Sequence, residues 1–322
     1  MRMLLVLLGV LIAPAFGQGQ VVKLDGPICG FVFDPPSRTI RPLLGIPGAA
    51  HLGAPTFSNL DFAAVSPDGR QALAVRDGQL WILRDPTAPI ASPIDNAIDH
   101  PERIIWASDS STAALYSSSA RSIQRVQLLV GSPQLDPPID TSFLPGPISA
   151  LAVDTKGRIA VGVSDPAAGG VYLFSFDKPP AQIASVNDPS ALVFSGKGLY
   201  IADRQSRSVL EIPDLAAGGI APFLAEQDGV VDPAAIAISP DQRRFYLASR
   251  EDRTLRVYQI NTRSLIAELP LDSEPSRIDS LSQPSLFALN TRQKPTDSLL
   301  LLDGRSGDSV YFVPAAPIGP EE

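Results

Sequence analysis

Side chains that could carry catalysis or bind a transition metal are scarce in this chain of 322 residues. His51 and His100 are the only histidines, and Cys29 is the only cysteine. General-base catalysis and zinc sites usually depend on histidine. Both histidines stand next to glycine, alanine or proline, so we expect them in loops, and we expect Cys29 to be a small core residue. Motifs for zinc binding, haem attachment or a nucleophile elbow do not occur. The sequence favours a protein without catalysis but leaves an enzyme open.

Oxygen ligands for calcium are the remaining possibility for a metal site. The segment from Asp303 to Asp308 could fold around calcium, which takes several oxygen ligands. The same glycine-rich segment is more simply a turn between two strands. We therefore expect no cofactor, with calcium as the one metal left open.

Charged side chains gather in short segments that each follow an apolar stretch. Guanidinium groups suit carboxylates and phosphates, and loops on a rigid scaffold often carry binding. These segments therefore predict a surface for a polar or anionic ligand, although loops that simply face water would look the same. The predicted binding residues are Arg76, Asp77, Asp165, Asp203, Arg204, Arg250, Glu251 and Arg292.

A repeat of about 43 residues must position these segments. Each unit has a short apolar strand, a polar turn with Asp, Gly or Pro, a second apolar strand and then a third. The last apolar residues before the first turns are spaced 41 to 47 residues apart, at Val65, Trp106, Val153, Phe194, Ile238 and Leu281. Four strands in 40–45 residues is the period of a β-propeller blade. We therefore predict an all-β propeller; a pair of β-sandwiches would not need one period across six units.

The segment before Val65 resembles a shortened first blade. One period back lies Val21–Leu24, and a hairpin follows, with strands at Gly30–Phe33 and Thr39–Leu43 around a turn at Asp34–Ser37. The sequence therefore predicts seven blades. Six blades plus an accessory hairpin is the alternative.

Short stretches of the repeats resemble known propeller families. Leu199–Ile212 resembles an NHL repeat, Phe245–Thr262 a YVTN-type repeat, and the Ser-Pro-Asp-Gly turn at Ser66–Gly69 recurs in WD40-like propellers. This resemblance covers most of residues 57 to 313 and implies an exported bacterial propeller. It names no function, because such propellers serve binding, scaffolding and several chemistries. A calcium-assisted hydrolase or lactonase of the SMP-30 type, which uses the central channel, is the alternative to a binding or scaffolding module.

The two ends of the chain are predicted to lie outside the propeller. Arg2, the apolar run Leu4–Ile12 and the small residues at Ala15 and Gly17 are typical of a signal peptide cleaved before Gln18. We therefore predict a signal peptide at 1–17, one propeller domain at 18–313 and a flexible tail at 314–322. The protein is expected to be secreted or periplasmic, and no later apolar run is long enough to span a membrane.

The charge balance narrows the class of partner. The formal net charge is -8, and acidic and basic residues are interspersed. Nucleic-acid binding needs a basic face, so we exclude it. We expect a monomer that binds a protein, peptide or glycan through its charged loops.

Overall fold

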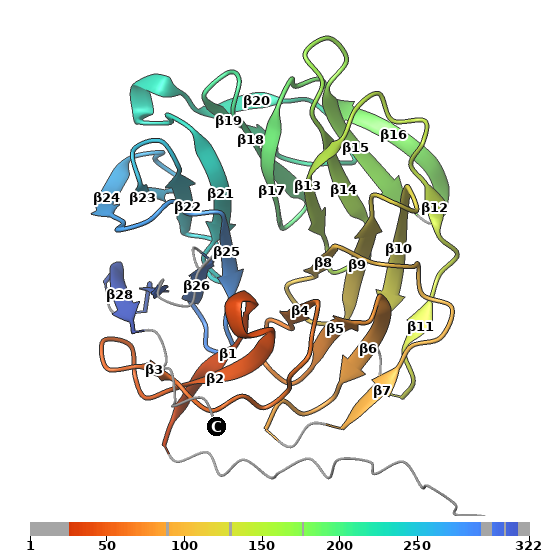
Figure 1. Cartoon of the computed structure of the whole chain (residues 1–322). Helices are drawn as coiled ribbons and strands as arrows, with labels where there is room; N and C mark the ends of the chain where they lie inside the picture. The colour runs from red at the N-terminus through yellow and green to blue at the C-terminus, as the bar shows by residue number, and fades with distance from the viewer. Residues whose placement is uncertain are drawn as a thin grey trace, which may run out of the picture.

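A computed structural model shows seven small antiparallel sheets arranged in a ring, so the chain is a seven-bladed β-propeller (Figure 1). The structure describes residues 26–87, 90–128, 131–175, 177–290, 298–305 and 307–314. The prediction of seven blades is confirmed. The predicted signal peptide and almost all of the predicted tail lie outside the described residues. No helix in the described part of the chain is long and apolar enough to cross a membrane.

Each sheet is one blade, and its strands follow one another in the sequence. Blades 1 to 3 contain β1 (Ile28–Asp34), β2 (Thr39–Leu44) and β3 (His51–Leu52); β4 (Phe62–Val65), β5 (Ala72–Arg76), β6 (Gln79–Leu83) and β7 (Ala91–Pro93); and β8 (Arg103–Trp106), β9 (Thr112–Ser117), β10 (Ser122–Gln127), β11 (Gln134–Leu135) and β12 (Ile139–Asp140). Blades 4 and 5 contain β13 (Ile148–Val153), β14 (Ile159–Val163), β15 (Gly170–Ser175) and β16 (Lys178–Ala184); and β17 (Pro189–Ser195), β18 (Gly198–Asp203), β19 (Ser208–Ile212) and β20 (Ala221–Leu224). Blades 6 and 7 contain β21 (Pro233–Ile238), β22 (Arg244–Ser249), β23 (Thr254–Gln259) and β24 (Leu265–Pro270); and β25 (Arg277–Ser280), β26 (Leu286–Asn290), β27 (Leu299–Asp303) and β28 (Ser309–Val313). Two short 3-10 helices, η1 (Pro35–Ser37) and η2 (Glu226–Asp228), lie in connections.

The core lies between blades, because each blade is apolar on both of its faces. On β22, Phe245 packs on the blade 5 side against Tyr200, with ring centres 5.2 Å apart. The next residue, Tyr246, packs on the blade 7 side against Phe287, at 5.3 Å. Successive side chains of a strand point to opposite faces, and burying each large apolar side chain contributes about 2 kcal/mol. The near-continuous apolar strands of the repeats are therefore what a ring of stacked blades requires.

Among the described residues blade 1 has three strands, and β1 takes the place that the second strand has in the other blades. The turn from β1 to β2 ends at Arg38 in the left-handed region (φ 54°), and the Arg38 carbonyl accepts a hydrogen bond from Leu60 N at 3.1 Å. Turns after the second strands of blades 3 and 6 end in the same way, at Arg121 and Arg253. The prediction of a shortened first blade is confirmed. The strand predicted at Val21–Leu24 lies outside the described residues.

The ring closes where blade 1 packs between blades 7 and 2. Ser282 Oγ donates a hydrogen bond to the Cys29 carbonyl at 3.3 Å, and Cys29 is fully buried in the cluster shared with blade 7, as predicted. The turns of blades 2 and 7 also meet directly. A Cβ on Gly69, whose φ is +69°, would lie 2.7 Å from the Ser282 Cβ, so only glycine fits this closure.

The antiparallel order of the strands gives the ring two distinct faces. Connections after second and fourth strands emerge on one face, which we call the loop face. Connections after first and third strands emerge on the other, which we call the turn face. The segment Asp303–Asp308 joins β27 to β28, as predicted for a turn, and therefore lies on the turn face.

Candidate functional site

The predicted binding residues that the structure describes all lie on the loop face, because each ends or follows the second strand of its blade. They are Arg76, Asp77, Asp165, Asp203, Arg204, Arg250 and Glu251. Arg292 lies outside the described residues. The structure divides the seven into side chains that hold the loops and side chains that are open to solvent.

Two of the predicted acids shape their own loops. The Asp203 side chain is buried and accepts hydrogen bonds from Asp188 N at 3.0 Å and Ser206 Oγ at 2.7 Å. Asp165 Oδ1 accepts from the backbone N–H groups of Ala167 and Ala168 at 2.8 and 2.7 Å. Aspartates often stabilise turns in this way. Both carboxylates therefore fix backbone and offer little to a ligand.

Arg204 joins blades 5 and 6 at the start of their inner strands. Its Nη1 lies 3.1 Å from Asp188 Oδ2, and its Nε lies 2.9 Å from Asp232 Oδ1. Asp188 also accepts a hydrogen bond from Ser164 Oγ of blade 4 at 2.8 Å. One polar chain thus crosses three blades on the loop face. About a third of the Arg204 side chain is exposed, so water and ligands can reach this chain.

The sequence analysis missed Asp188 and Asp232. Each directly precedes a proline that begins an inner strand, in the pairs Asp188-Pro189 and Asp232-Pro233. A search for an acid before the first strand of each repeat would have found both. It would also have found Glu274-Pro275, two residues before β25.

Arg250 occupies the same position in blade 6 as Arg204 in blade 5. The backbone N–H of Arg204 donates to the Asp188 carbonyl, and that of Arg250 donates to the Asp232 carbonyl, each at 3.0 Å. The two side chains differ. Arg250 is half-buried and, within the described part of the chain, no hydrogen bond or ion pair involves its guanidinium. Glu251 beside it is exposed.

The carboxylate nearest to Arg250 in the sequence, apart from Glu251, is already engaged. Asp252 Oδ2 lies 2.6 Å from Arg256 Nη2, and Asp252 Oδ1 accepts from Thr254 Oγ1 at 2.8 Å. Burial raises the pKa of Asp252, but hydrogen bonds from Arg256, Ser249 and Thr254 outweigh burial and hold the pKa below its usual value. Asp252 therefore stays ionised and stabilises the turn in which it lies.

Inner strands are also linked across blades 3, 4 and 5. Arg103 Nη1 donates to the Ser149 carbonyl at 3.0 Å, and Ser149 Oγ donates to the Pro189 carbonyl at 2.5 Å. Ser149 stands at a register shift between β13 and β14, and equivalent shifts occur at the starts of β17 and β21. Bulges of this kind redirect side chains and often border sites. The polar network thus follows the inner strands of blades 3 to 6.

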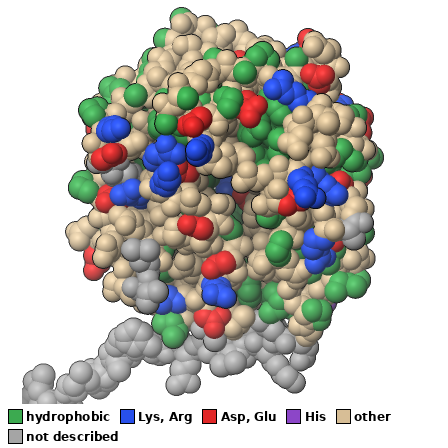
Figure 2. All heavy atoms as spheres, turned by 180° about the vertical axis from the view of Figure 1, so that it is seen from behind, with side chains coloured by type: hydrophobic (Ala, Val, Ile, Leu, Met, Phe, Trp, Pro, Cys, Tyr) green, Lys and Arg blue, Asp and Glu red, His purple; other side chains and the backbone are tan. Residues whose placement is uncertain are grey.

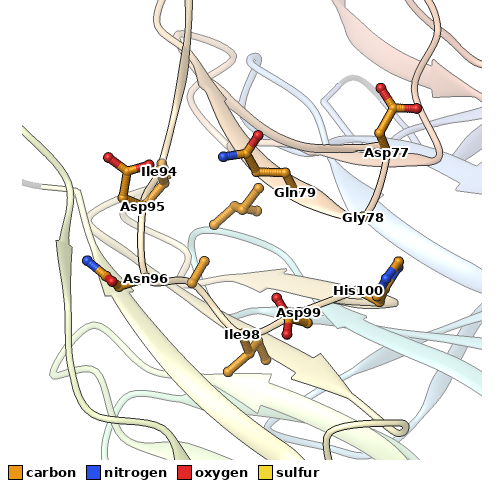
Figure 3. Close-up of a pocket in the computed structure, with 11 residues that line it drawn as sticks. Asp77, Gly78, Gln79, Ile94, Asp95, Asn96, Ile98, Asp99 and His100 are labelled. Carbon is orange, nitrogen blue, oxygen red and sulfur yellow. The ribbon is translucent and has the colours of Figure 1, made fainter.

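Arg76 and Asp77 lie near a separate hollow, between blades 2 and 3. The hollow has a volume of about 330 Å³, and Asp77, Asp95 and Asp99 are among the side chains around it (Figure 3). His100 N donates to the Gly78 carbonyl at 3.1 Å. A Cβ on Gly78 would lie 2.3 Å from the His100 ring, so His100 packs against the turn. Arg76 Nε lies 3.9 Å from Asp77 Oδ2, and neither residue contacts the Arg204 network.

Metal ligands do not gather in the described part of the chain: no group of three His, Cys, Asp or Glu side chains there could hold an ion. The acids of the segment that could have bound calcium are bonded to arginines. Asp303 pairs with Arg305 at 2.8 Å, and Asp308 pairs with Arg244 at 2.7 Å.

Figure 2 shows the face of the ring opposite to the view of Figure 1. Lysine and arginine side chains alternate there with acidic ones around a hollow at the centre. The two signs are mixed and form no continuous basic stripe on this face.

Comparisons with known proteins show the fold and leave the family open. No family model and no curated protein matches this chain. A functionally unknown protein from Desulfotomaculum acetoxidans is similar over 89% of this chain and 100% of that chain, at 13% identity and a TM-score of 0.64. The catalytically inactive variant of virginiamycin B lyase from Staphylococcus aureus, solved with quinupristin, is similar over 80% and 84%, at 12% identity and a TM-score of 0.59. The WD40 repeats of RRP9 match over 79% and 80%, at 12% identity and a TM-score of 0.57. At these identities the likeness is one of fold.

Proposed function

We propose that this protein is a non-catalytic binding or scaffolding module that takes a protein, peptide or glycan on its loop face. The observation that supports this most is the partly exposed chain of Ser164, Asp188, Arg204 and Asp232, which crosses three blades at the inner strands. Charged groups that are fixed in place and still open to solvent suit recognition of a polar partner. Histidines do not take part in this chain of contacts, and the residues it does contain match no nucleophile–base arrangement.

Arrays of peptides and glycans test this proposal directly. The labelled protein is expected to bind a subset of the array, and Arg204→Ala is expected to remove that binding. The matched control is Arg243→Ala, because Arg243 is an exposed arginine on the turn face. Ligands that bind both variants as they bind the original protein would contradict a site on the loop face. Circular dichroism of both variants verifies that the fold is kept.

Elemental analysis of the same protein separates this proposal from the calcium-assisted hydrolase. The binding module is expected to contain no stoichiometric calcium. One tightly held ion per chain would favour the hydrolase and would call for a screen of lactones and phosphoesters.

We also propose that the chain is an exported bacterial protein of the NHL or YVTN type. The apolar run at Leu4–Ile12 and the repeat resemblances support this. N-terminal sequencing of the protein recovered from the periplasm or medium is expected to begin at Gln18. An intact Met1 on protein retained in the cytoplasm would contradict export.

A further inference from the structure

Two consecutive blades repeat the same pair of charged positions on the loop face, and the sequence of blade 7 contains the same pair. An arginine follows the second strand at Arg204 and Arg250, and Arg292 has the same place in the sequence of blade 7. An acid precedes the first strand at Asp188, Asp232 and Glu274. The backbone bonds from Arg204 to Asp188 and from Arg250 to Asp232, both 3.0 Å long, show that these positions are equivalent in space.

In blades 4 and 5 the residue at the arginine position reaches forward to the acid of the next blade. In blade 4 this residue is Ser164, which bonds to Asp188 at 2.8 Å. In blade 5 it is Arg204, which bonds to Asp232 at 2.9 Å. The next step would join Arg250 to Glu274. Within the described residues, neither the Arg250 guanidinium nor the Glu274 carboxylate has a hydrogen bond or ion pair.

The acids around Arg250 do not supply a substitute. Asp232 Oδ1 is held by Arg204, and Asp252 is held by Arg256 and Thr254. Glu251 and Glu274 are exposed. Arg250 is therefore a half-buried residue at the end of an ordered polar chain, and its guanidinium has no acceptor in the described part of the molecule.

We propose that Arg250 binds a carboxylate of a peptide or protein ligand, at the step between blades 6 and 7. A guanidinium presents a planar fork of N–H donors that matches both oxygens of a carboxylate. Arg204 shows the geometry that this position supports when carboxylates are supplied by the chain itself. The inference rests on the proposed function, and it names the ligand group and the residue that receives it.

The alternative is that Arg250 and Glu274 form an ion pair in solution, as Arg204 and Asp232 do at the preceding boundary. Thermal unfolding separates the two. If Arg250 is open, Arg250→Ala leaves the melting temperature unchanged, whereas Arg204→Ala lowers it by about 2 °C. An equal fall for both variants would show that Arg250 is already paired and would overturn the proposal.

Calorimetric titration with defined peptides tests the ligand group. The first probe is an N-acetylated pentapeptide with two glutamates and an amidated C-terminus. The second has no acidic side chain but a free C-terminal carboxylate, so the two arms distinguish the sources of the carboxylate. The same pentapeptide with glutamines is the neutral control. We expect one of the two carboxylate probes to bind and the neutral peptide not to bind.

Substitutions at the site then assign the binding to Arg250. Arg250→Ala is expected to weaken it at least about tenfold, since a charge-assisted bond is lost, and Arg250→Lys to weaken it less. Arg243→Ala should leave it unchanged. Binding of neither carboxylate probe to the original protein, or equal affinity in Arg250→Ala, would overturn the inference. The proposed function would still stand if the array ligands remained sensitive to Arg204→Ala.

Discussion

The two boundaries of blade 6 differ in their polar contacts. Both are tied on the turn face, by Arg263 to the Pro222 carbonyl of blade 5 and by Arg244 to Asp308 of blade 7, but within the described residues only the boundary with blade 5 is tied on the loop face. The boundary with blade 5 is tied on the loop face, where Arg204 bonds to Asp188 and Asp232. The boundary with blade 7 is tied on the turn face, where Asp308 accepts from Arg244 at 2.7 Å and from Tyr246 OH at 3.3 Å. A ring of equivalent repeats therefore does not distribute its polar contacts evenly. A boundary fixed at one end can leave charged groups free at the other, and here the free group is Arg250.

The largest effect is expected from breaking the tie on the turn face. The Asp308 side chain is only 4% exposed, so Asp308→Ala removes the ion pair of Arg244 and leaves the buried Tyr246 hydroxyl without its acceptor. We expect a loss of about 3 kcal/mol in the free energy of unfolding, measured with urea. Asp241→Ala, at an exposed pair on the same face, serves as the control and should cost less than about 1 kcal/mol. Equal losses would show that the tie does not hold the boundary.

Alkaline unfolding tests a buried tyrosine at the boundary of blades 5 and 6. Burial raises the pKa of Tyr258, whose hydroxyl donates to the Asp228 carbonyl, from 10.0 to about 12. The unfolded chain ionises first, so the stability present below pH 10 is lost as the pH rises towards 12. This loss amounts to about 2 kcal/mol. Tyr258→Phe should flatten the fall in stability over that range, measured by urea unfolding at each pH. An unchanged slope would mean that Tyr258 ionises normally.

A smaller effect is expected from breaking the tie on the loop face. Arg204 is partly exposed, so water screens its two ion pairs. Arg204→Ala should lower the free energy of unfolding by about 1 kcal/mol, less than Asp308→Ala. A loss as large as that of Asp308→Ala would mean that the two boundaries are held alike.

The smallest effect concerns the turns that carry the loop-face arginines. Arg253 and Arg207 both have left-handed backbones, with φ of 51° and 49°. Arg253 is exposed, whereas Arg207 pairs with Glu226 at 2.8 Å. Glycine removes the strain of this conformation, so Arg253→Gly should gain roughly 0.5 kcal/mol in urea unfolding. Arg207→Gly is the matched variant and should gain less, since it also loses an ion pair. A loss of stability in Arg253→Gly would show that its side chain makes contacts in solution.

Sequence periodicity predicted the blades because each strand carries its own apolar pattern. The spacing of Val65, Trp106 and the later apolar residues that precede first turns therefore predicted the ring of blades. The hairpin around Asp34–Ser37 predicted the incomplete first blade. The periodicity also placed Arg204 and Arg250 on one face, since equivalent loops of a propeller lie together. These inferences needed only local pattern and the repeat.

Contacts between blades could not be predicted from the same pattern. Arg244 and Asp308 are 64 residues apart, and nothing local marks them as partners. Asp203 has the same residue type and place as a binding acid, yet the fold buries it as a turn cap. Asp188 and Asp232 could have been found through the prolines that follow them, but their pairing with Arg204 depends on how neighbouring blades face each other.

A pair of double-mutant cycles tests the difference between the two boundaries most directly. One cycle combines Arg204→Ala with Asp232→Ala, and the other combines Arg250→Ala with Glu274→Ala, all measured by urea unfolding. We predict a coupling free energy of about 1 kcal/mol for the first pair and about zero for the second. Equal couplings would contradict the account, because Arg250 would then be tied to the chain and not open to a ligand.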